Sequence, residues 1–172
     1  MKYPNLFLAG APKCGTTSLA YYLGQHSEIF APLVKEPVFF GSDLTGKGPR
    51  LSESVYSEYY EQWSTERFAL DASTHYFYSK TAAKEIAEVS RDAFIIVMVR
   101  NPIDAAYSMF HQLRFNGAEV LNTFEESLDA EKKRAQNLRP PKFGYAENFL
   151  YSRVYSFTKN IQRFESRFGK ES

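Results

Sequence analysis

Three short apolar runs stand out in the alternation of hydrophobic and polar residues along the chain. They cover residues 6–9, 67–72 and 93–99, and the third run is apolar at positions that face both sides of a strand. Such runs are typical of strands that are covered on both faces in a parallel sheet. The pattern therefore predicts three strands, with residues 93–99 in the centre of the sheet.

Longer amphipathic segments separate and follow these runs. We expect helices over residues 17–25, 52–63, 79–90, 124–135 and 148–168. A further helix is expected to open at Asn101-Pro102, because proline suits the first helical turn. Residues 31–48 are rich in proline and glycine and are expected to be mostly loop. Strands alternating with helices indicate an α/β fold, with a P-loop-like parallel sheet flanked by helices.

Composition narrows the possible functions. The 172 residues suit one domain, and 44% of them are hydrophobic, which is enough for a core. The net charge of +1 gives no reason to expect a nucleic acid or an anionic membrane as partner, so any anion site must be local. The apolar stretch 6–10 is too short for a leader or a membrane span, so we expect a cytoplasmic protein.

A glycine-containing loop follows the first predicted strand and precedes a predicted helix. Gly10 and Gly15 have the spacing of a Walker A loop, but Thr16 occupies the position of the Walker lysine and the lysine is Lys13 instead. Glycines let backbone N–H groups approach an anion, and a helix N-terminus adds partial positive charge. We therefore predict a phosphate-binding loop made of Pro12, Lys13, Cys14, Gly15, Thr16, Thr17 and Ser18.

A second candidate motif follows the strand predicted at 93–99. Arg100 leaves the end of that strand, and Ser108 comes eight residues later, about two turns into the next helix. A guanidinium group binds phosphate through a planar pair of N–H donors, and a serine hydroxyl can donate to the same group. Ligands of parallel sheets bind where strands end, so both motifs are expected to meet at one edge.

The two motifs together resemble those of sulfotransferases that use 3′-phosphoadenosine 5′-phosphosulfate. The Pro-Lys-x-Gly-Thr-Thr segment resembles their 5′-phosphosulfate loop, and the segment from Arg100 to Ser108 resembles the one that binds the 3′-phosphate. The resemblance implies in-line transfer of a sulfuryl group to a hydroxyl or amine, with adenosine 3′,5′-bisphosphate as product and no metal. Lys13 is then the natural partner of the leaving phosphate.

Two residues are candidates for the base that accepts the proton of the acceptor. Glu36 lies in Lys-Glu-Pro-Val-Phe-Phe, which resembles the Lys-Glu-x-x-Phe-Phe segment of heparan-type and bacterial sulfotransferases, and its apolar neighbours are expected to raise its pKa. His75 lies in a Thr-His pair like that of the cytosolic phenol and steroid enzymes. The same stretch also resembles the heparan-type Glu-Lys-[Ser/Thr]-Pro-x-Tyr segment, although Asp71 and Ala72 depart from it. We favour Glu36 over His75.

The sequence gives rise to three further expectations. The family's C-terminal loop that clamps the 3′-phosphate has no counterpart before residue 172, so we expect a domain without its C-terminal part and with weak donor affinity. The thiol of Cys14 is expected to have a lowered pKa, with the residue contributing through its backbone. The acceptor can be a small molecule, a lipid or a carbohydrate, and most of a set of aromatic residues are expected in the core: Phe39, Phe40, Tyr76, Phe77 and Tyr78.

Two alternatives stay open. A P-loop kinase of small molecules is disfavoured by Thr16 in place of the Walker lysine and by a strand that ends in Val99-Arg100 without an acidic residue. A non-catalytic nucleotide-binding module is the third possibility, and the departures at Asp71 and Ala72 give it some support. The three histidines and one cysteine show no metal-ligand spacing.

Overall fold

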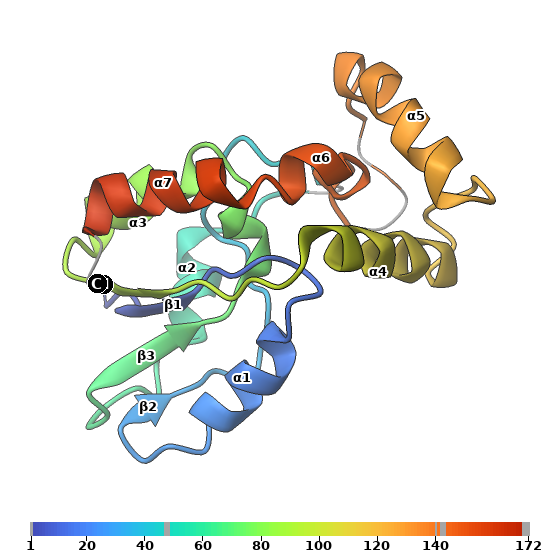
Figure 1. The fold of residues 1–172 in the computed structure, drawn as a ribbon. Coiled ribbons are helices and arrows are strands. Elements are labelled where there is room, and N and C mark those ends of the chain that lie inside the picture. The colour runs from blue at the N-terminus through green and yellow to red at the C-terminus, as the bar shows by residue number, and fades with distance from the viewer. Residues whose placement is uncertain (1, 47–48, 140, 142–143, 170–172) are drawn as a thin grey trace.

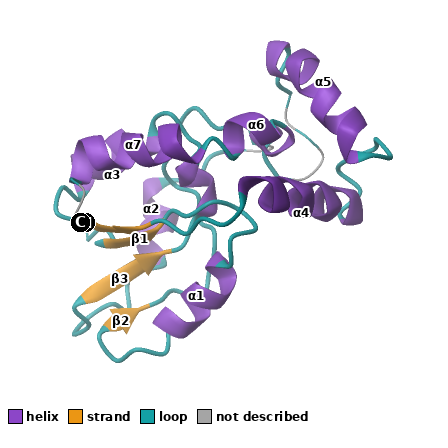
Figure 2. Cartoon of the chain, viewed as in Figure 1, coloured by secondary structure: helices purple, strands orange, loops and turns teal. Residues whose placement is uncertain are grey.

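The structure is a computed structural model that describes residues 2–46, 49–139, 141 and 144–169. At its centre lies a parallel sheet with the strand order β2-β3-β1-β4. The strands are β1 (Leu6–Leu8), β2 (Ile29–Phe30), β3 (Phe68–Asp71) and β4 (Phe94–Ile96). The prediction of an α/β fold with a parallel sheet and flanking helices is confirmed (Figures 1 and 2).

The helices alternate with the strands and then continue as a helical C-terminal half. They are α1 (Thr16–Leu23), α2 (Glu53–Glu58), α3 (Ala82–Val89), α4 (Pro102–Phe115), α5 (Phe124–Gln136), α6 (Tyr151–Val154) and α7 (Phe157–Phe168). Two short 3₁₀ helices, η1 (Thr74–Phe77) and η2 (Ala146–Phe149), complete the order.

Strand β1 is buried on both faces and so defines two layers of core. Leu6 and Leu8 pack towards α1, together with Leu19 of that helix. Phe7, between them in the strand, packs on the other side, in the cluster that contains Ile86 of α3. The ribbon shows α1 on one face of the sheet and α3 with α7 on the opposite face (Figure 1). The alternation along a strand thus matches a helix layer on each side.

Strand β4 differs from the prediction in its position. We expected residues 93–99 in the centre of the sheet, but β4 lies at one edge of the four described strands and pairs only with β1. Phe94 keeps 45% and Val99 47% of their surface exposed. The prediction failed because apolar residues on two faces report which faces are covered, and say nothing of which strands lie alongside.

The long helix predicted over residues 148–168 is also wrong. The chain instead forms η2, then α6, and then α7 after a turn at Tyr155 and Ser156. The side chain of the buried Asn160 explains the break, because its Nδ2 donates to the carbonyl oxygen of Val154 at 2.9 Å. A polar side chain that satisfies helix-end carbonyls in this way favours two helices over one.

Candidate active site

The loop after β1 is held against the end of β4 by backbone hydrogen bonds. Ala9 donates to the carbonyl of Ile96 and Ala11 donates to that of Met98, both at 3.0 Å. A Cβ atom at Gly10 would lie only 2.5 Å from the backbone nitrogen of Met98, so this close approach requires glycine. The two predicted donor motifs therefore start from a common point in the fold.

Helix α1 begins where this loop ends. Gly15 is its N-cap residue, with a φ of 85° in the left-handed region that glycine adopts without strain. Among the described residues no side chain caps this end of α1, so the first-turn N–H groups keep their capacity to bind an anion. Thr16 and Thr17 line the adjacent cavity with Gly15. The N-terminus of α1 thus faces the cavity with free N–H donors.

Helix α4 carries the second motif to the same place. Its N-cap residue Asn101 accepts hydrogen bonds from the backbone N–H groups of Ile103, at 2.9 Å, and Asp104, at 3.3 Å. The preceding residue, Arg100, donates from Nη1 to the carbonyl oxygen of Lys13 at 3.4 Å and pairs with Asp104 at 3.7 Å. Arg100 is thus fastened to the first loop, and Ser108 lines the same cavity.

One cavity of about 520 Å³ collects most of the residues predicted from the sequence. Those that line it are Pro12, Lys13, Gly15, Thr16, Thr17, Glu36, His75, Arg100 and Ser108. Two predicted donor-loop residues do not: Ser18 is exposed on α1, and Cys14 is buried with its thiol 3.6 Å from the carbonyl of Pro12. The structure therefore brings both donor motifs and both candidate bases to one place.

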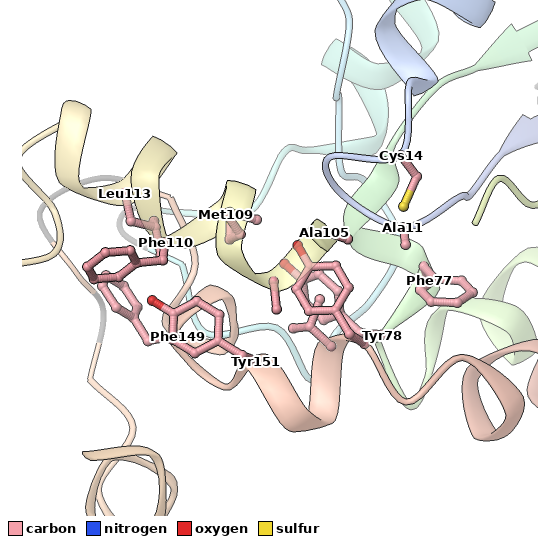
Figure 3. Close-up of a cluster of buried hydrophobic side chains, with 13 residues drawn as sticks. Ala11, Cys14, Phe77, Tyr78, Ala105, Met109, Phe110, Leu113, Phe149 and Tyr151 are labelled. Atoms are coloured by element: carbon pink, nitrogen blue, oxygen red, sulfur yellow. The ribbon is translucent and has the colours of Figure 1, made fainter. Parts of the chain in front are cut away.

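Cys14 belongs to the hydrophobic cluster beneath the loop (Figure 3) and is not among the residues that line the cavity. Burial raises the pKa of its thiol, and the nearby Arg100 offsets this only in part. The expected lowering of this pKa is therefore wrong, because desolvation of the buried thiol, among apolar neighbours such as Ala11 and Phe77, outweighs the hydrogen bond from the backbone N–H of Arg100. Its contribution to the loop is packing and backbone.

The two candidate bases form a hydrogen-bonded pair. Nδ1 of His75 lies 3.2 Å from Oε2 of Glu36. Since a carboxylate only accepts, Nδ1 carries the proton in this contact. Thr74 donates to the same carboxylate from its backbone N–H at 2.8 Å and from its hydroxyl at 3.1 Å, and Lys35 adds an ion pair at 2.6 Å. The sequence predicted both candidate bases but not the hydrogen bond between them.

These donors control the charge of Glu36. Burial by itself raises the pKa of Glu36, but the hydrogen bonds and charges of His75 and then Lys35 outweigh it and lower the pKa to about 2. The prediction that apolar neighbours raise this pKa is therefore wrong. The reason is that the Phe side chains after Pro37 turn into the core, while the carboxylate faces cationic and N–H donors. Glu36 is ionised at neutral pH.

A buried network fixes the loop that carries Glu36. The fully buried Asp71 accepts hydrogen bonds from the hydroxyls of Ser73, at 2.6 Å, and Tyr76, at 2.8 Å. Those hydroxyl oxygens in turn accept from the backbone N–H groups of Val38, at 3.1 Å, and Phe39, at 3.0 Å. The loop is thereby tied to the end of β3.

The aromatic residues of this region mostly belong to the core. Tyr76, Phe77 and Tyr78 are fully buried, Phe40 is 4% exposed, and Phe39 is half-buried. The expectation that most of them are core residues is confirmed. Among the residues that the structure describes, none of these five lines the cavity of about 520 Å³.

Two residues of the site were missed by the sequence analysis. Gln112 accepts a hydrogen bond from Nζ of Lys13 at 3.1 Å and lines the cavity from α4. It lies four residues after Ser108, and this spacing places both on one helix face, so helical periodicity was a usable signal. Thr74, which holds Glu36 by two groups, gave no signal beyond its place before His75.

Metal sites and membrane-spanning helices are two other features that bear on function. Among the residues that the structure describes, no group of three or more His, Cys, Asp or Glu side chains is arranged to hold a metal ion. Within the same residues, none of the helices combines the length and the hydrophobicity that crossing a bilayer requires.

The fold and cavity define an α/β protein in which the glycine-containing loop after β1 and a second motif around Arg100 meet at the same sheet edge. Comparison with known proteins identifies the class further. The sulfotransferase domain family matches residues 3–161 of this chain. The chain therefore belongs to the sulfotransferase domain family, whose members use 3′-phosphoadenosine 5′-phosphosulfate.

Individual relatives agree with this assignment. The bifunctional heparan sulfate N-deacetylase/N-sulfotransferase 1 of Xenopus laevis is 30% identical over 143 residues, which are 80% of this chain and 16% of the relative. The membrane-associated sulfotransferase kil1 of Dictyostelium discoideum is 26% identical over 111 residues, 63% of this chain and 22% of that protein. The chain thus spans about a fifth or less of these relatives.

A solved structure has the same fold. The crystal structure of a sulfotransferase from Alicyclobacillus acidocaldarius superimposes with a TM-score of 0.86 at 31% sequence identity. The match covers 99% of this chain and 71% of that one. The arrangement of strands and helices described above is therefore that of a sulfotransferase.

Proposed function

We propose that this chain transfers a sulfuryl group from 3′-phosphoadenosine 5′-phosphosulfate to a hydroxyl or amine. The observation that carries the proposal is the single cavity of about 520 Å³ shared by the loop around Lys13, by Arg100 with Ser108, and by the Glu36–His75 pair. Donor binding, leaving-group stabilisation and proton removal need those three groups within one small volume.

The residues at the cavity fit the two ends of such a donor. The uncapped N-terminus of α1 and the hydroxyls of Thr16 and Thr17 suit the 5′-phosphosulfate. Arg100 and Ser108 suit the 3′-phosphate, because a guanidinium fork and a hydroxyl both donate to phosphate oxygens. The contact between Arg100 and the carbonyl of Lys13 supports a fixed spacing between the two phosphate positions.

The chemistry then assigns a role to each charged side chain. The acceptor oxygen or nitrogen forms a bond to sulfur as the bond between sulfur and the bridging phosphate oxygen breaks. Lys13, which in this structure is bonded to Gln112, neutralises the charge that develops on the departing 5′-phosphate. Glu36 takes the acceptor's proton, and His75 is its hydrogen-bonded partner.

The acceptor class follows less directly. Relatives named for heparan sulfate support a carbohydrate acceptor, and lipids or small molecules are the other classes that suit a hydroxyl or amine chemistry. The family match gives no support to a kinase of small molecules. A nucleotide-binding module without activity would bind the bisphosphate product and transfer nothing.

The test compares Glu36→Gln with His75→Ala in a sulfuryl-transfer assay. We expect Glu36→Gln to lower kcat/KM by about 100-fold to 10,000-fold, the range of a lost general base. Because His75 lowers the pKa of Glu36, His75→Ala should raise that pKa and move the acidic limb of the kcat/KM profile to higher pH. The exposed Glu28→Gln serves as a matched control and should behave like the unmodified protein.

Three outcomes would contradict parts of the proposal. Near-normal turnover of Glu36→Gln, with intact binding of adenosine 3′,5′-bisphosphate, would show that His75 acts as the base. Product binding without transfer to any acceptor would favour the inactive module. Much stronger thermal stabilisation by ATP with magnesium than by the bisphosphate would favour the kinase alternative.

A further inference from the structure

A second cavity of about 430 Å³ runs along the side of α1. One wall is the face of α1 formed by Ala20, Tyr21 and Gly24, and the other is the loop after β2, residues 31–35. Leu70 and Ala72, at the end of β3, also line it. We call this cavity the α1 groove. It lies between a helix and a loop that both lead into the candidate active site.

The α1 groove presents apolar side chains to solvent. Leu33 is fully exposed, Tyr21 is 69% exposed and Val34 is 39% exposed. Ala31 and Pro32 are partly exposed there, whereas Leu70 and Ala72 are buried, at 2% and 7% exposure. Large apolar side chains gathered on a concave surface are typical of a ligand site, because a bound apolar group removes them from water.

The α1 groove adjoins the candidate active site. Thr17 lines both cavities. Lys35 lines the groove and forms the 2.6 Å ion pair with Glu36, whose backbone N–H donates to the carbonyl of Ala72 at 3.2 Å. Glu36, which lines the candidate active site, is therefore next in the chain to a residue that lines the α1 groove and is paired with it.

We propose that the α1 groove binds the apolar part of the acceptor, an aliphatic chain or aromatic ring that carries the reacting hydroxyl or amine. This inference rests on the proposed sulfuryl transfer. A molecule seated along α1 brings its polar end to Glu36 and Thr17, where its proton can be removed. The cation of the groove, Lys35, is already paired with Glu36, so the groove offers little to the carboxylates and sulfates of a polyanionic chain.

The first arm of the test measures kcat/KM for n-alkanols from butanol to octanol with 3′-phosphoadenosine 5′-phosphosulfate as donor. Each added methylene that enters the groove should raise kcat/KM about fourfold, as expected from the transfer free energy of a buried CH₂. Leu33→Ser and Tyr21→Ser should reduce this increment, and both side chains are exposed enough to be replaced without loss of the fold. Val120→Ser is the matched control, because Val120 is 81% exposed and lines neither cavity.

The second arm separates the groove from the catalysis. Octanol binding is measured by calorimetry on the chain loaded with adenosine 3′,5′-bisphosphate, and should weaken in Leu33→Ser but not in Val120→Ser. Octanol binding of this kind without any sulfation would support the groove while contradicting the proposed function. Turnover that is independent of alkyl length, or that falls equally in the groove and control variants, would overturn the groove. If the groove variants lose as much turnover with a glucosamine oligosaccharide as with octanol, the groove binds carbohydrate instead.

Discussion

Glu36 and Asp71 lie close together, but their surroundings shift their pKa values in opposite directions. Donors from His75 and Lys35 lower the pKa of Glu36 to about 2 despite its burial. Asp71 is fully buried, and this burial, together with the negative charge of Glu36, raises its pKa to about 6 even though three hydroxyls donate to it. Glu36 is thus poised as an anion facing the cavity, whereas Asp71 acts as an internal anchor.

The raised pKa of Asp71 predicts a pH-dependent stability. Its pKa in the fold, about 6, lies above the ordinary value of 3.8, so the stabilisation from this group is complete below about pH 4 and is lost as pH rises through 6. Asp71→Asn removes that dependence. The difference in unfolding free energy between the unmodified protein and the variant, from urea titrations, should be larger at pH 4 than at pH 7 by on the order of 3 kcal/mol. A difference that stays constant over this range would show that Asp71 titrates normally.

At the residue scale, the sequence predicted which residues line the site more accurately than it predicted their contacts and pKa values. Lys13, Glu36, His75, Arg100 and Ser108 were all predicted and all line one cavity. The direction of the pKa of Glu36 was wrong because it depends on contacts between residues 36 and 75, which no local pattern encodes. The loop there also places Glu36 at a φ of 59°, in the left-handed region that residues with a side chain rarely adopt.

At the element scale, the starts of the helices were predictable because capping is local. Asn101 before Pro102, and Thr123 before α5, were visible as polar residues ahead of amphipathic segments, and both accept first-turn N–H groups. Strand β2 was missed because two residues carry no periodicity. The break between α6 and α7 was missed because it is stabilised by the side chain of Asn160, six residues further along the chain.

The cap of α4 should affect both stability and donor binding. Asn101→Ala removes two hydrogen bonds and should cost about 1 kcal/mol, which lowers Tm by roughly 2–4 °C in a chain of this size. Because Arg100 is the adjacent residue, the affinity for adenosine 3′,5′-bisphosphate should also fall. Thr123→Ala is the control, since it uncaps α5 at similar cost and touches neither donor motif. Equal affinities of the two variants for adenosine 3′,5′-bisphosphate would show that the cap of α4 does not contribute to donor binding.

At the scale of the whole molecule, the C-terminal segment supports a loop more than 140 residues earlier. The hydroxyl of Tyr155, in the turn between α6 and α7, donates to the carbonyl of Pro12 at 3.3 Å. Its ring lies in the same cluster as Ala11 and Cys14 under the donor loop. Neither contact could be read from the sequence, because the predicted single helix would have carried this residue elsewhere.

This long-range contact can be tested with matched tyrosines. Tyr155→Phe keeps the ring and should cost about 1 kcal/mol of stability through the lost hydrogen bond. Tyr60→Phe loses a comparable bond, from its hydroxyl to the carbonyl of Leu70 at 3.4 Å, away from the donor loop. Calorimetry with the bisphosphate should show weaker binding, by about twofold to fivefold, only in Tyr155→Phe. Weakening of the same size in both variants would mean that the loss follows global stability.

The contact between Gly10 and Met98 sets the dimension of the whole site. Since the loop and the end of β4 touch without room for a Cβ atom, the fold fixes the distance between the loop around Lys13 and the motif around Arg100. An engineer who wants this scaffold to accept a longer or shorter nucleotide therefore cannot adjust the crossing itself. The adjustable part is α4, where moving the serine position by one helical turn shifts it by about 5 Å and leaves the crossing intact.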